Sequence, residues 1–482
     1  MTPSFLRRAL GDGIRRLAAA AACAALLPAA ARAQLPDIPA GPRSLTLESA
    51  MELAREHNPG LAQQANDVRM AGVSIRSAYG DLLPGLSLSS SLGYMASGER
   101  RVGSVSLGDQ PSVYSSNYAV SASYALSAPK LLQPAVARAE ARETEKRVAG
   151  SAATLRADVS RRYLAVLQAQ ARLRQSDRDV ARAADYLRQA TAQANAGMTS
   201  PLDRQRSQVN HAQAEIRRLQ ARRTLRNEVV SLGRTLGVAL DPEVELPSRF
   251  ELFEPRWSRD ELVAAALRDN PALQAARGQV ESARARTGAA RAGYLPTLTL
   301  SVGMNGWIQR SGDVEALVRQ RLGTGTVSPQ VEAEIRERVR RENQGFPFGY
   351  NSQPLSASAT VSLPLFQGYA RRTQVERSRA AAEDADAHRR GEELRVFTEV
   401  TAALANVVSA YELARAQTVV REQAAEELRL ADQRLRMGAS HQLAVTDAQA
   451  RLGQAELDEI DAVYAFHVGL ADLEALVGAP LR

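Results

Sequence analysis

The sequence has almost no cysteine. Cys23 is the one cysteine in 482 residues, and it lies in a segment that we expect to be removed. The mature chain is therefore predicted to form no disulfide bond and no thiolate metal site. Long apolar runs are also missing, since after residue 33 none approaches the roughly 18 residues of a membrane-spanning helix. If the chain crosses a membrane, it must do so with β-strands.

Patterns of catalysis and ligand binding are missing as well. The five histidines form no His-Glu-x-x-His motif, and Gly323-Thr-Gly325 lacks the rest of a phosphate-binding fingerprint. The nearest group of metal-binding residue types, the acidic residues and histidine within 383–388, is typical of a solvated helix face. We therefore predict no enzyme activity, no metal site and no cofactor.

Residues 1–33 have the pattern of a secretory signal peptide. Four arginines precede an apolar run over residues 17–27 and the small-residue cleavage pattern Ala31-Arg-Ala33. Ala20 stands three residues before Cys23, where a lipidation signal usually has a large aliphatic residue, so we do not expect a lipid anchor. The chain is predicted to leave the cytoplasm.

The net charge of +8 does not indicate a nucleic-acid partner. The signal peptide, with five arginines and one aspartate, accounts for half of it. The remaining arginines alternate with glutamate and aspartate along stretches of helical pattern, which is typical of solvated helix faces. We predict no nucleic-acid binding.

The chain contains an internal repeat of two copies. The segment Leu45 to Leu61, with an Asn-Pro pair at its end, recurs as Trp257 to Leu273, and Leu83-Pro84 recurs as Leu295-Pro296. These pairs are 212 residues apart, whereas Gly197 and Gly438 are 241 apart. The second copy must therefore contain an insertion, which we place in residues 305–354.

Each copy contains two segments that alternate between apolar and small polar residues. They begin near Leu86, Tyr118, Leu298 and Leu355, and each spans about nine to eleven residues, which suits a transmembrane barrel wall. A soluble sandwich with one wet face would show the same alternation. Aromatic residues near the segment ends favour the membrane, since an interfacial girdle places them there: Tyr79, Tyr94, Tyr118, Tyr294, Trp307, Tyr350, Phe366 and Tyr369. Four strands cannot close a barrel alone, so oligomers are expected.

The remaining stretches have helical periodicity over unusual lengths. Residues 134–195 and 370–436 each predict a helix of about 90 Å, far longer than an ordinary globular domain. Each ends at a glycine followed by Ser or Thr, which predicts a turn into a returning helix. We place these turns at residues 195–201 and 436–441.

These patterns divide the chain into two repeats with short connecting segments. The predicted parts are a signal peptide (1–33), an N-terminal linker (34–44), a first repeat (45–243) with a β-hairpin at about 84–129, an inter-repeat linker (244–256), and a second repeat (257–482) with a β-hairpin at about 296–365. In the second hairpin, the inserted loop 305–354 is expected outside the cell.

The duplicated motifs resemble the TolC family of bacterial outer-membrane efflux proteins. The shared features are the two Leu-x-x-Ala-x-x-x-Asn-Pro-x-Leu openings, the Leu-Pro-x-Leu-x-Leu strand entries, the glycine turns and the terminal Leu-Gly or Val-Gly pairs, and they cover residues 45–482. The resemblance implies a homotrimer in the outer membrane of a Gram-negative-type bacterium. Each protomer would give four transmembrane strands to one twelve-stranded β-barrel, continued by a periplasmic α-helical barrel of antiparallel coiled-coil hairpins.

The resemblance also implies partners and contact sites. A periplasmic adaptor and an inner-membrane pump or ABC exporter would energise transport, and the adaptor would dock on the hairpin tips, which are Gly197, Met198, Thr199, Ser200, Gly438, Ala439 and Ser440. Family members carry acidic residues at the tunnel entrance, and Asp447 matches one such position while Ala444 replaces the other. Three Asp447 side chains would favour cations. An ordinary exposed aspartate would account for the residue equally well.

The sequence thus predicts a passive channel-tunnel for efflux or type I secretion. Two alternatives remain: a periplasmic coiled-coil scaffold without a pore, which leaves the four alternating segments unexplained, and an envelope enzyme or metal-binding protein, which lacks a recognisable site. Drugs, metal ions and polypeptides all pass through proteins of this family, so the substrate stays open.

Overall fold

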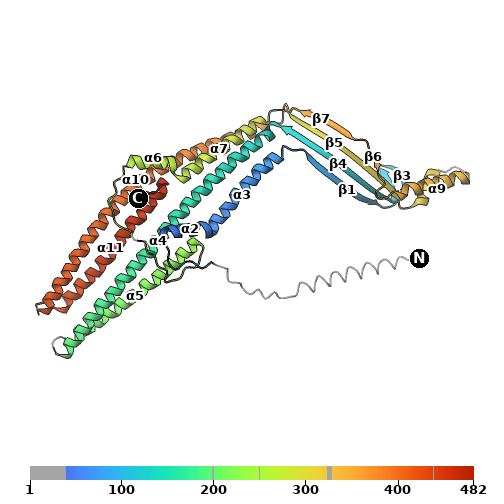
Figure 1. Cartoon of the computed structure of the whole chain (residues 1–482). Helices are drawn as coiled ribbons and strands as arrows, with labels where there is room; N and C mark the ends of the chain where they lie inside the picture. The colour runs from blue at the N-terminus through green and yellow to red at the C-terminus, as the bar shows by residue number, and fades with distance from the viewer. Residues whose placement is uncertain (1–38, 198–199, 249, 323–327, 438, 482) are drawn as a thin grey trace, which may run out of the picture.

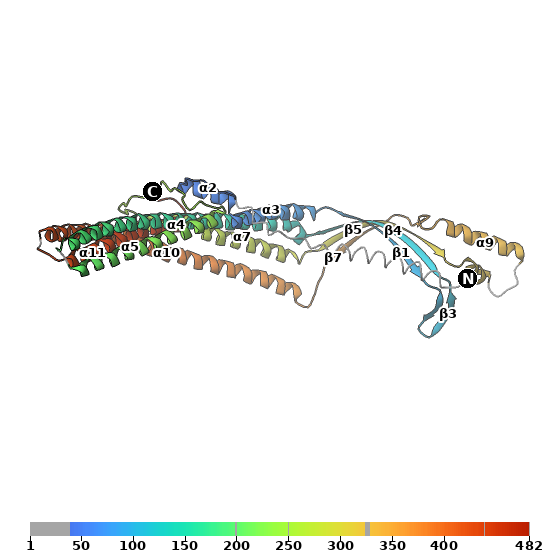
Figure 2. The ribbon, with the colours of Figure 1, turned by 90° about the horizontal axis from the view of Figure 1, so that it is seen from below.

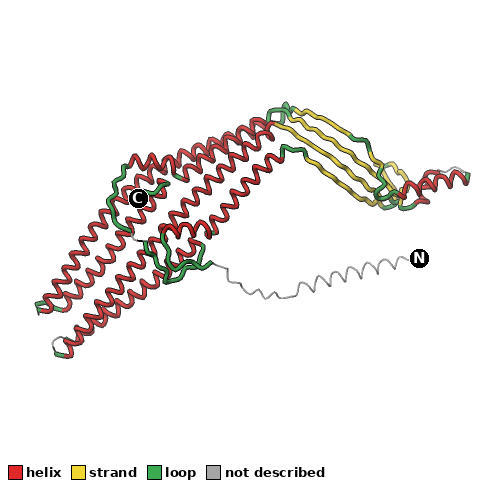
Figure 3. Tube along the Cα trace, viewed as in Figure 1, coloured by secondary structure: helices red, strands yellow, loops and turns green. Residues whose placement is uncertain are grey.

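The molecule is long and thin, with three zones along its length. The computed structural model describes residues 39–197, 200–248, 250–322, 328–437 and 439–481. Long helices occupy one end, a narrow sheet follows, and a small helical part lies at the far end (Figure 1). Figure 3 separates these zones by secondary structure, and Figure 2 shows the thin edge of the molecule. The signal peptide expected at residues 1–33 lies outside the described residues.

The elements follow one another in the same order in each half of the chain. The first half contains α2 (Leu47–His57), α3 (Pro59–Gly80), β1 (Gly85–Met95), β2 (Gly98–Val102), β3 (Val105–Gln110), β4 (Val113–Ser127), α4 (Ala128–Asn195) and α5 (Pro201–Leu236). The second contains α6 (Arg259–Asp269), α7 (Pro271–Ala292), β5 (Thr297–Ser311), α8 (Val314–Leu322), α9 (Pro329–Gln344), β6 (Asn351–Ser352), β7 (Ser356–Ser362), α10 (Ala370–Arg436) and α11 (Gln442–Val477). The predicted mixture of strands and very long helices is confirmed. In the part of the chain that the structure describes, no helix is both long and apolar enough to cross a membrane.

The duplicated Asn-Pro pair separates two helices and caps the second. Asn58 accepts a hydrogen bond from the Leu61 N–H at 2.9 Å through its Oδ1 atom, while its Nδ2 atom donates to the Thr235 carbonyl at 2.8 Å. Asn270 makes the equivalent bonds with Leu273 and Leu476. A proline at the first helical position costs no hydrogen bond, so the pair begins a new helix and ties it to the end of a distant one.

Two glycines complete this connection. Gly237 and Gly478 end α5 and α11 with φ of +81°, in the left-handed region that favours glycine. A Cβ atom on Gly237 would lie 2.2 Å from the His57 carbonyl oxygen, and one on Gly478 would lie 2.7 Å from that of Asp269. The motif that opens each repeat is therefore packed directly against the motif that closes it.

Each repeat has its own apolar core at this junction. The first is built from α2, α4 and α5 around Val159, Tyr163 and Leu232, and the Tyr163 hydroxyl donates to the Leu45 carbonyl at 2.9 Å. The second is built from α6, α10 and α11 around Val400 and Phe466. Both cores are almost completely shielded from solvent, so they fix the middle of the long helices.

The segments predicted as linkers lie against these cores. Ala40 and Ser44 form parallel bridges with Ala239 and Glu245, which places part of the N-terminal segment beside the end of the first repeat. In residues 244–256, Leu246 is nearly buried and Phe253 packs edge-on against Phe466 at 5.4 Å. In the described residues, both connecting segments are therefore packed against the helices.

The sheet is antiparallel, in the order β1-β4-β5-β7, with the short β6 also paired to β5. The registers align Leu88 with Val120 and Val120 with Met304, so apolar residues share one face across three strands. Within the described chain, β1 pairs only with β4, and β7 only with β5. Both outer strands therefore present open edges.

Two strands are longer than the sequence indicated. β4 begins at Val113 instead of near Tyr118, and β5 continues to Ser311, which moves the start of the inserted segment from residue 305 to after Ser311. The two extensions pair with each other, as Val113 with Ser311, although Ser116 and Gly306 interrupt the apolar pattern. Hydrogen bonding to a neighbouring strand, which the alternation does not reveal, extends both strands. The connection between β1 and β4 forms a further hairpin, β2–β3, which the alternation did not indicate.

The helices lie side by side in one layer. Near the hairpin tips the order is α5, α4, α11, α10, and nearer the sheet it is α3, α4, α7, α10, as the contacts between neighbours require. Consequently α10 forms one margin of the layer, whereas α3 and α5 form the other.

Candidate functional site

The first hairpin tip joins α4 to α5 and is built by a glycine and a serine. Gly197 has a φ of +72°, which ends α4, and the Ser200 hydroxyl caps α5 by accepting a hydrogen bond from the Leu202 N–H at 3.2 Å. Met198 and Thr199 lie outside the described residues. Gly197 and Ser200 are both exposed, as a docking surface requires.

The second tip joins α10 to α11 at the same end of the molecule (Figures 1 and 2). The Ala439 N–H donates to the Arg434 carbonyl at 2.8 Å, and Ser440 follows in the turn. Gly438 lies outside the described residues. The structure thus places the described parts of both sequence-predicted tips at the same end of the molecule, although they are far apart in the chain.

Asp447 lies on α11 shortly after this tip. Its side chain is exposed in the isolated protomer, while the neighbouring Val445 and Ala448 are buried in the hairpin. The carboxylate is therefore free to face the tunnel or a neighbouring protomer, and its role as an entrance residue stays a prediction.

A line of ion pairs joins the two hairpins above the tips. α11 carries seven acidic residues and one basic residue, whereas α4 carries thirteen basic and seven acidic residues, so the two helices attract each other. Two half-exposed pairs, Arg161 with Asp472 at 2.8 Å and Arg172 with Asp461 at 2.6 Å, cross this seam. Exposed pairs of this kind contribute about 0–1 kcal/mol each, so they align the helices more than they stabilise them.

The lowest ion pair of the seam is more buried and better connected. Arg182 donates to Glu456 at 2.6 Å, and also to Asp179, which accepts a bond from Gln175 at 2.6 Å. Burial acts to raise the pKa of the Glu456 carboxyl, but the hydrogen bond and positive charge of Arg182 outweigh it and hold that pKa below its usual value. This cluster holds α4 and α11 together at the end of their contact nearest the hairpin tips.

The helical layer is apolar along both margins. α5 exposes Leu202, Val209, Ile216, Leu219 and Val230, and α10 exposes Leu394, Phe397, Leu413, Val419, Val420 and Leu430. Ile216 lies two residues, or about 200° around the helix, from the buried Ala214, so it points away from α4. Such stripes on both free margins are typical of surfaces that another chain covers.

The sheet has two chemically different faces. One carries Leu86, Leu88 and Leu92, which are 71–78% exposed, with the aligned apolar residues of β4, β5 and β7. The other carries hydroxyls that pair across strands, Ser87 with Ser121 at 2.8 Å and Ser301 with Ser358 at 3.0 Å. A face of this exposure and apolarity suits lipid, and the hydroxyl face suits water.

Aromatic residues at the far end of the sheet are split between the two faces. On the apolar face Tyr94 packs at a tilt against Tyr114, and Tyr118 packs edge-on against Tyr350, each pair with ring centroids 4.8 Å apart. Trp307 lies on the hydroxyl face instead, because it alternates with Gly306 and Ile308 along β5. The expected aromatic girdle therefore does not include Trp307, and counting the alternation past Met304 would have placed it correctly.

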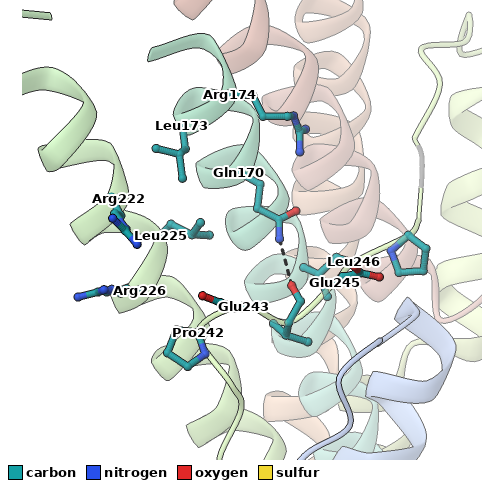
Figure 4. A pocket seen from close by; sticks show the side chains of 12 residues that line it. Gln170, Leu173, Arg174, Arg222, Leu225, Arg226, Pro242, Glu243, Glu245 and Leu246 are labelled. Atoms are coloured by element: carbon teal, nitrogen blue, oxygen red, sulfur yellow. Dashed lines mark hydrogen bonds between the residues drawn. The ribbon is translucent and has the colours of Figure 1, made fainter. Parts of the chain in front are cut away.

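Two other features of the surface offer less specific chemistry. In residues 383–388, Glu383 is bonded to Arg379 and Asp386 to Arg389, and among the described residues no three His, Cys, Asp or Glu side chains are grouped to hold a metal ion. A pocket between α4, α5 and residues 242–247 mixes arginines and glutamates, and Gln170 donates there to the Val244 carbonyl at 3.4 Å (Figure 4). That hydrogen bond holds residues 242–247 against α4. The mixed charges of the pocket favour no single ligand.

Comparison with known proteins agrees with this geometry. A family model described as outer membrane efflux protein matches residues 50–238 and 262–479, one match in each half. The CmeC outer membrane channel of Campylobacter jejuni has a similar fold, with a TM-score of 0.70 and 14% identity over 90% of this chain and 85% of that one.

Two curated relatives are similar in sequence over part of their length. Protein CyaE of Bordetella pertussis is 26% identical over 71% of this chain and 65% of its own. The cobalt-zinc-cadmium resistance protein CzcC of Cupriavidus metallidurans is 28% identical over 32% of this chain and 37% of its own. The chain thus spans less than two thirds of either relative, but the family model covers most of it in both halves. The chain belongs to the outer membrane efflux protein family.

Proposed function

We propose that this chain is one protomer of a homotrimeric channel-tunnel that passes substrates out of the cell through the outer membrane. The observation that carries the proposal is the open sheet, which exposes leucines on one face and hydroxyls on the other. Four strands cannot close a barrel, and eight is the smallest number that fills its own interior. Three copies joined from β7 to β1 give twelve strands, which leaves no open edge.

The helical layer supports the same assembly. Its margins, α5 with α3 on one side and α10 on the other, carry the apolar stripes that a neighbouring copy would cover. Three layers joined at these margins form a closed tunnel that continues the barrel. A periplasmic scaffold without a pore would use the helices equally well, but it leaves an apolar sheet face in water.

Transport through this tunnel is passive in our proposal, and no catalytic role is assigned to the chain. Energy comes from an inner-membrane pump or ABC exporter, which reaches the tunnel through a periplasmic adaptor docked at Gly197, Ser200, Ala439 and Ser440. One relative is named as a cobalt-zinc-cadmium resistance protein, and our proposal includes both efflux and type I secretion. Exposure of both tips at one end of the layer supports docking there.

The test is single-channel conductance of the detergent-extracted protein in a planar bilayer, with the oligomeric mass measured on the same sample. We expect discrete conductance steps from a particle of three protomers. A monomeric, non-conducting protein would overturn the channel and favour the scaffold.

A further inference from the structure

The hydroxyl face of the sheet is uncharged along the described strands. In β1, β4, β5 and β7 the residues of this face are serine, threonine, asparagine, glutamine, alanine and glycine, with three exceptions: Met95 at the end of β1, Val113 at the start of β4, and Trp307 in β5. Several of these polar groups bond to each other, as Ser91 does to Asn117. A wall of paired neutral groups offers passing solutes no charge and few free hydrogen-bonding partners.

Trp307 is the only aromatic side chain on this face of the described strands β1, β4, β5, β6 and β7. It pairs with Asn117 of β4 on one side and Asn351 of β6 on the other, and its neighbours on the same face of β5 are Asn305 and Gln309. The residue is 44% exposed, although an indole is usually buried against other apolar groups. It lies four residues before the end of β5, near the end of the sheet furthest from the long helices α4 and α10.

We propose that Trp307 forms an aromatic binding station inside the outer mouth of the channel, and that its ligands are flat aromatic cations. This inference rests on the proposed trimer, which brings three indoles into one lumen at the same height. An exposed indole face attracts organic cations through its ring quadrupole and stacks on flat aromatic molecules, and tryptophan is the strongest of the aromatic residues in this role.

The surroundings of Trp307 determine which solutes gain from it. Because the adjacent groups are amides and hydroxyls, no fixed charge competes for the cation. A hydrated metal ion keeps its water shell at such a wall, since neutral, mutually bonded groups are poor replacements for that water. An aromatic cation buries apolar surface against the indole and so removes it from water, and only this class of solute is therefore retained.

The test is block of single-channel current in a planar bilayer by three probes added on the side opposite the helices: N-methylquinolinium, tetraethylammonium and Zn²⁺. We expect N-methylquinolinium to block the unmodified channel far better than the other two. Trp307→Ala should weaken its block about tenfold, whereas Trp307→Phe should retain part of it because a smaller ring remains. Asn305→Ala, two residues away on the same face, should leave the block within about twofold.

The outcomes separate this inference from the proposed function. If the unmodified protein conducts but Trp307→Ala and Trp307→Phe are blocked as strongly as it is, the aromatic station is wrong and the channel stands. Equal block by tetraethylammonium or Zn²⁺ would also overturn it. An unmodified protein without conductance would instead contradict the channel itself.

Discussion

At Gly237 the backbone of one helix end touches the backbone of another helix, and no side chain fits between them. We expect Gly237→Ala to clash with the His57 carbonyl, 2.2 Å from the new Cβ atom, and to add about 1–3 kcal/mol of strain from the left-handed φ. The result should be a lower unfolding temperature of the helical part by circular dichroism, together with fewer assembled oligomers.

Gly197 provides the matched control for this substitution. Its φ of +72° is similar, but a Cβ atom there has open space around it. Gly197→Ala should therefore cost only the backbone strain. Equal losses in the two variants would mean that the contact between the repeat motifs is unimportant.

Glu456 should make the seam between the hairpins sensitive to acid. Its pKa is held below the usual value in the folded protein, so the stability it adds is present above about pH 4.5 and is lost as the pH falls through the lower, folded pKa. Glu456→Gln should remove about 1–3 kcal/mol at pH 7 and flatten the dependence of the unfolding temperature on pH below 5. Glu412→Gln, at an exposed glutamate of α10, makes the same chemical change outside the Arg182 cluster and serves as the control. If Glu456→Gln left the pH profile unchanged, the assigned role of the ion pair would be wrong.

Asp447 should influence the selectivity of the channel if three copies meet at the entrance. Asp447→Asn removes three negative charges from one ring, so we expect the preference for cations over anions to fall. The measurement is the reversal potential of reconstituted channels in a salt gradient. An unchanged reversal potential would contradict the role of Asp447 in selectivity.

Among whole elements, α5 is the clearest candidate for contact with another protomer. Ile216→Glu places a charge in the middle of its apolar stripe, opposite the side packed on α4, so we expect monomers with intact helices. Gln208→Glu introduces the same charge on a flank of the helix and should assemble normally. Sedimentation and circular dichroism of both variants would distinguish lost assembly from lost folding, and a fully trimeric Ile216→Glu would contradict this interface.

The order of elements was predictable from the sequence, but their contacts were not. Alternation and helical periodicity are local, so β1, β4, β5 and the long helices were recognised. The pairing of Val113 with Ser311, and of Arg182 with Glu456, joins residues far apart in the chain, and no local pattern indicates it. The face of Trp307 was predictable in the same way as the strands, because the alternation of β5 continues from Met304 to residue 307.

At the scale of the whole molecule, the duplication reduces the number of contacts that must form between separate chains. A ring of three layers contains six hairpins, and in each layer the seam between α4 and α11 already joins two of them within one chain. That seam forms at the effective concentration set by the covalent connection, commonly millimolar, whatever the number of copies in the cell. Only the three contacts between protomers, where α10 meets the α3–α5 margin and β7 meets β1, depend on protein abundance. A shortage of the chain should therefore leave folded single protomers, each a third of the ring with its two hairpins paired, and dilution should part the ring only at the three contacts between protomers.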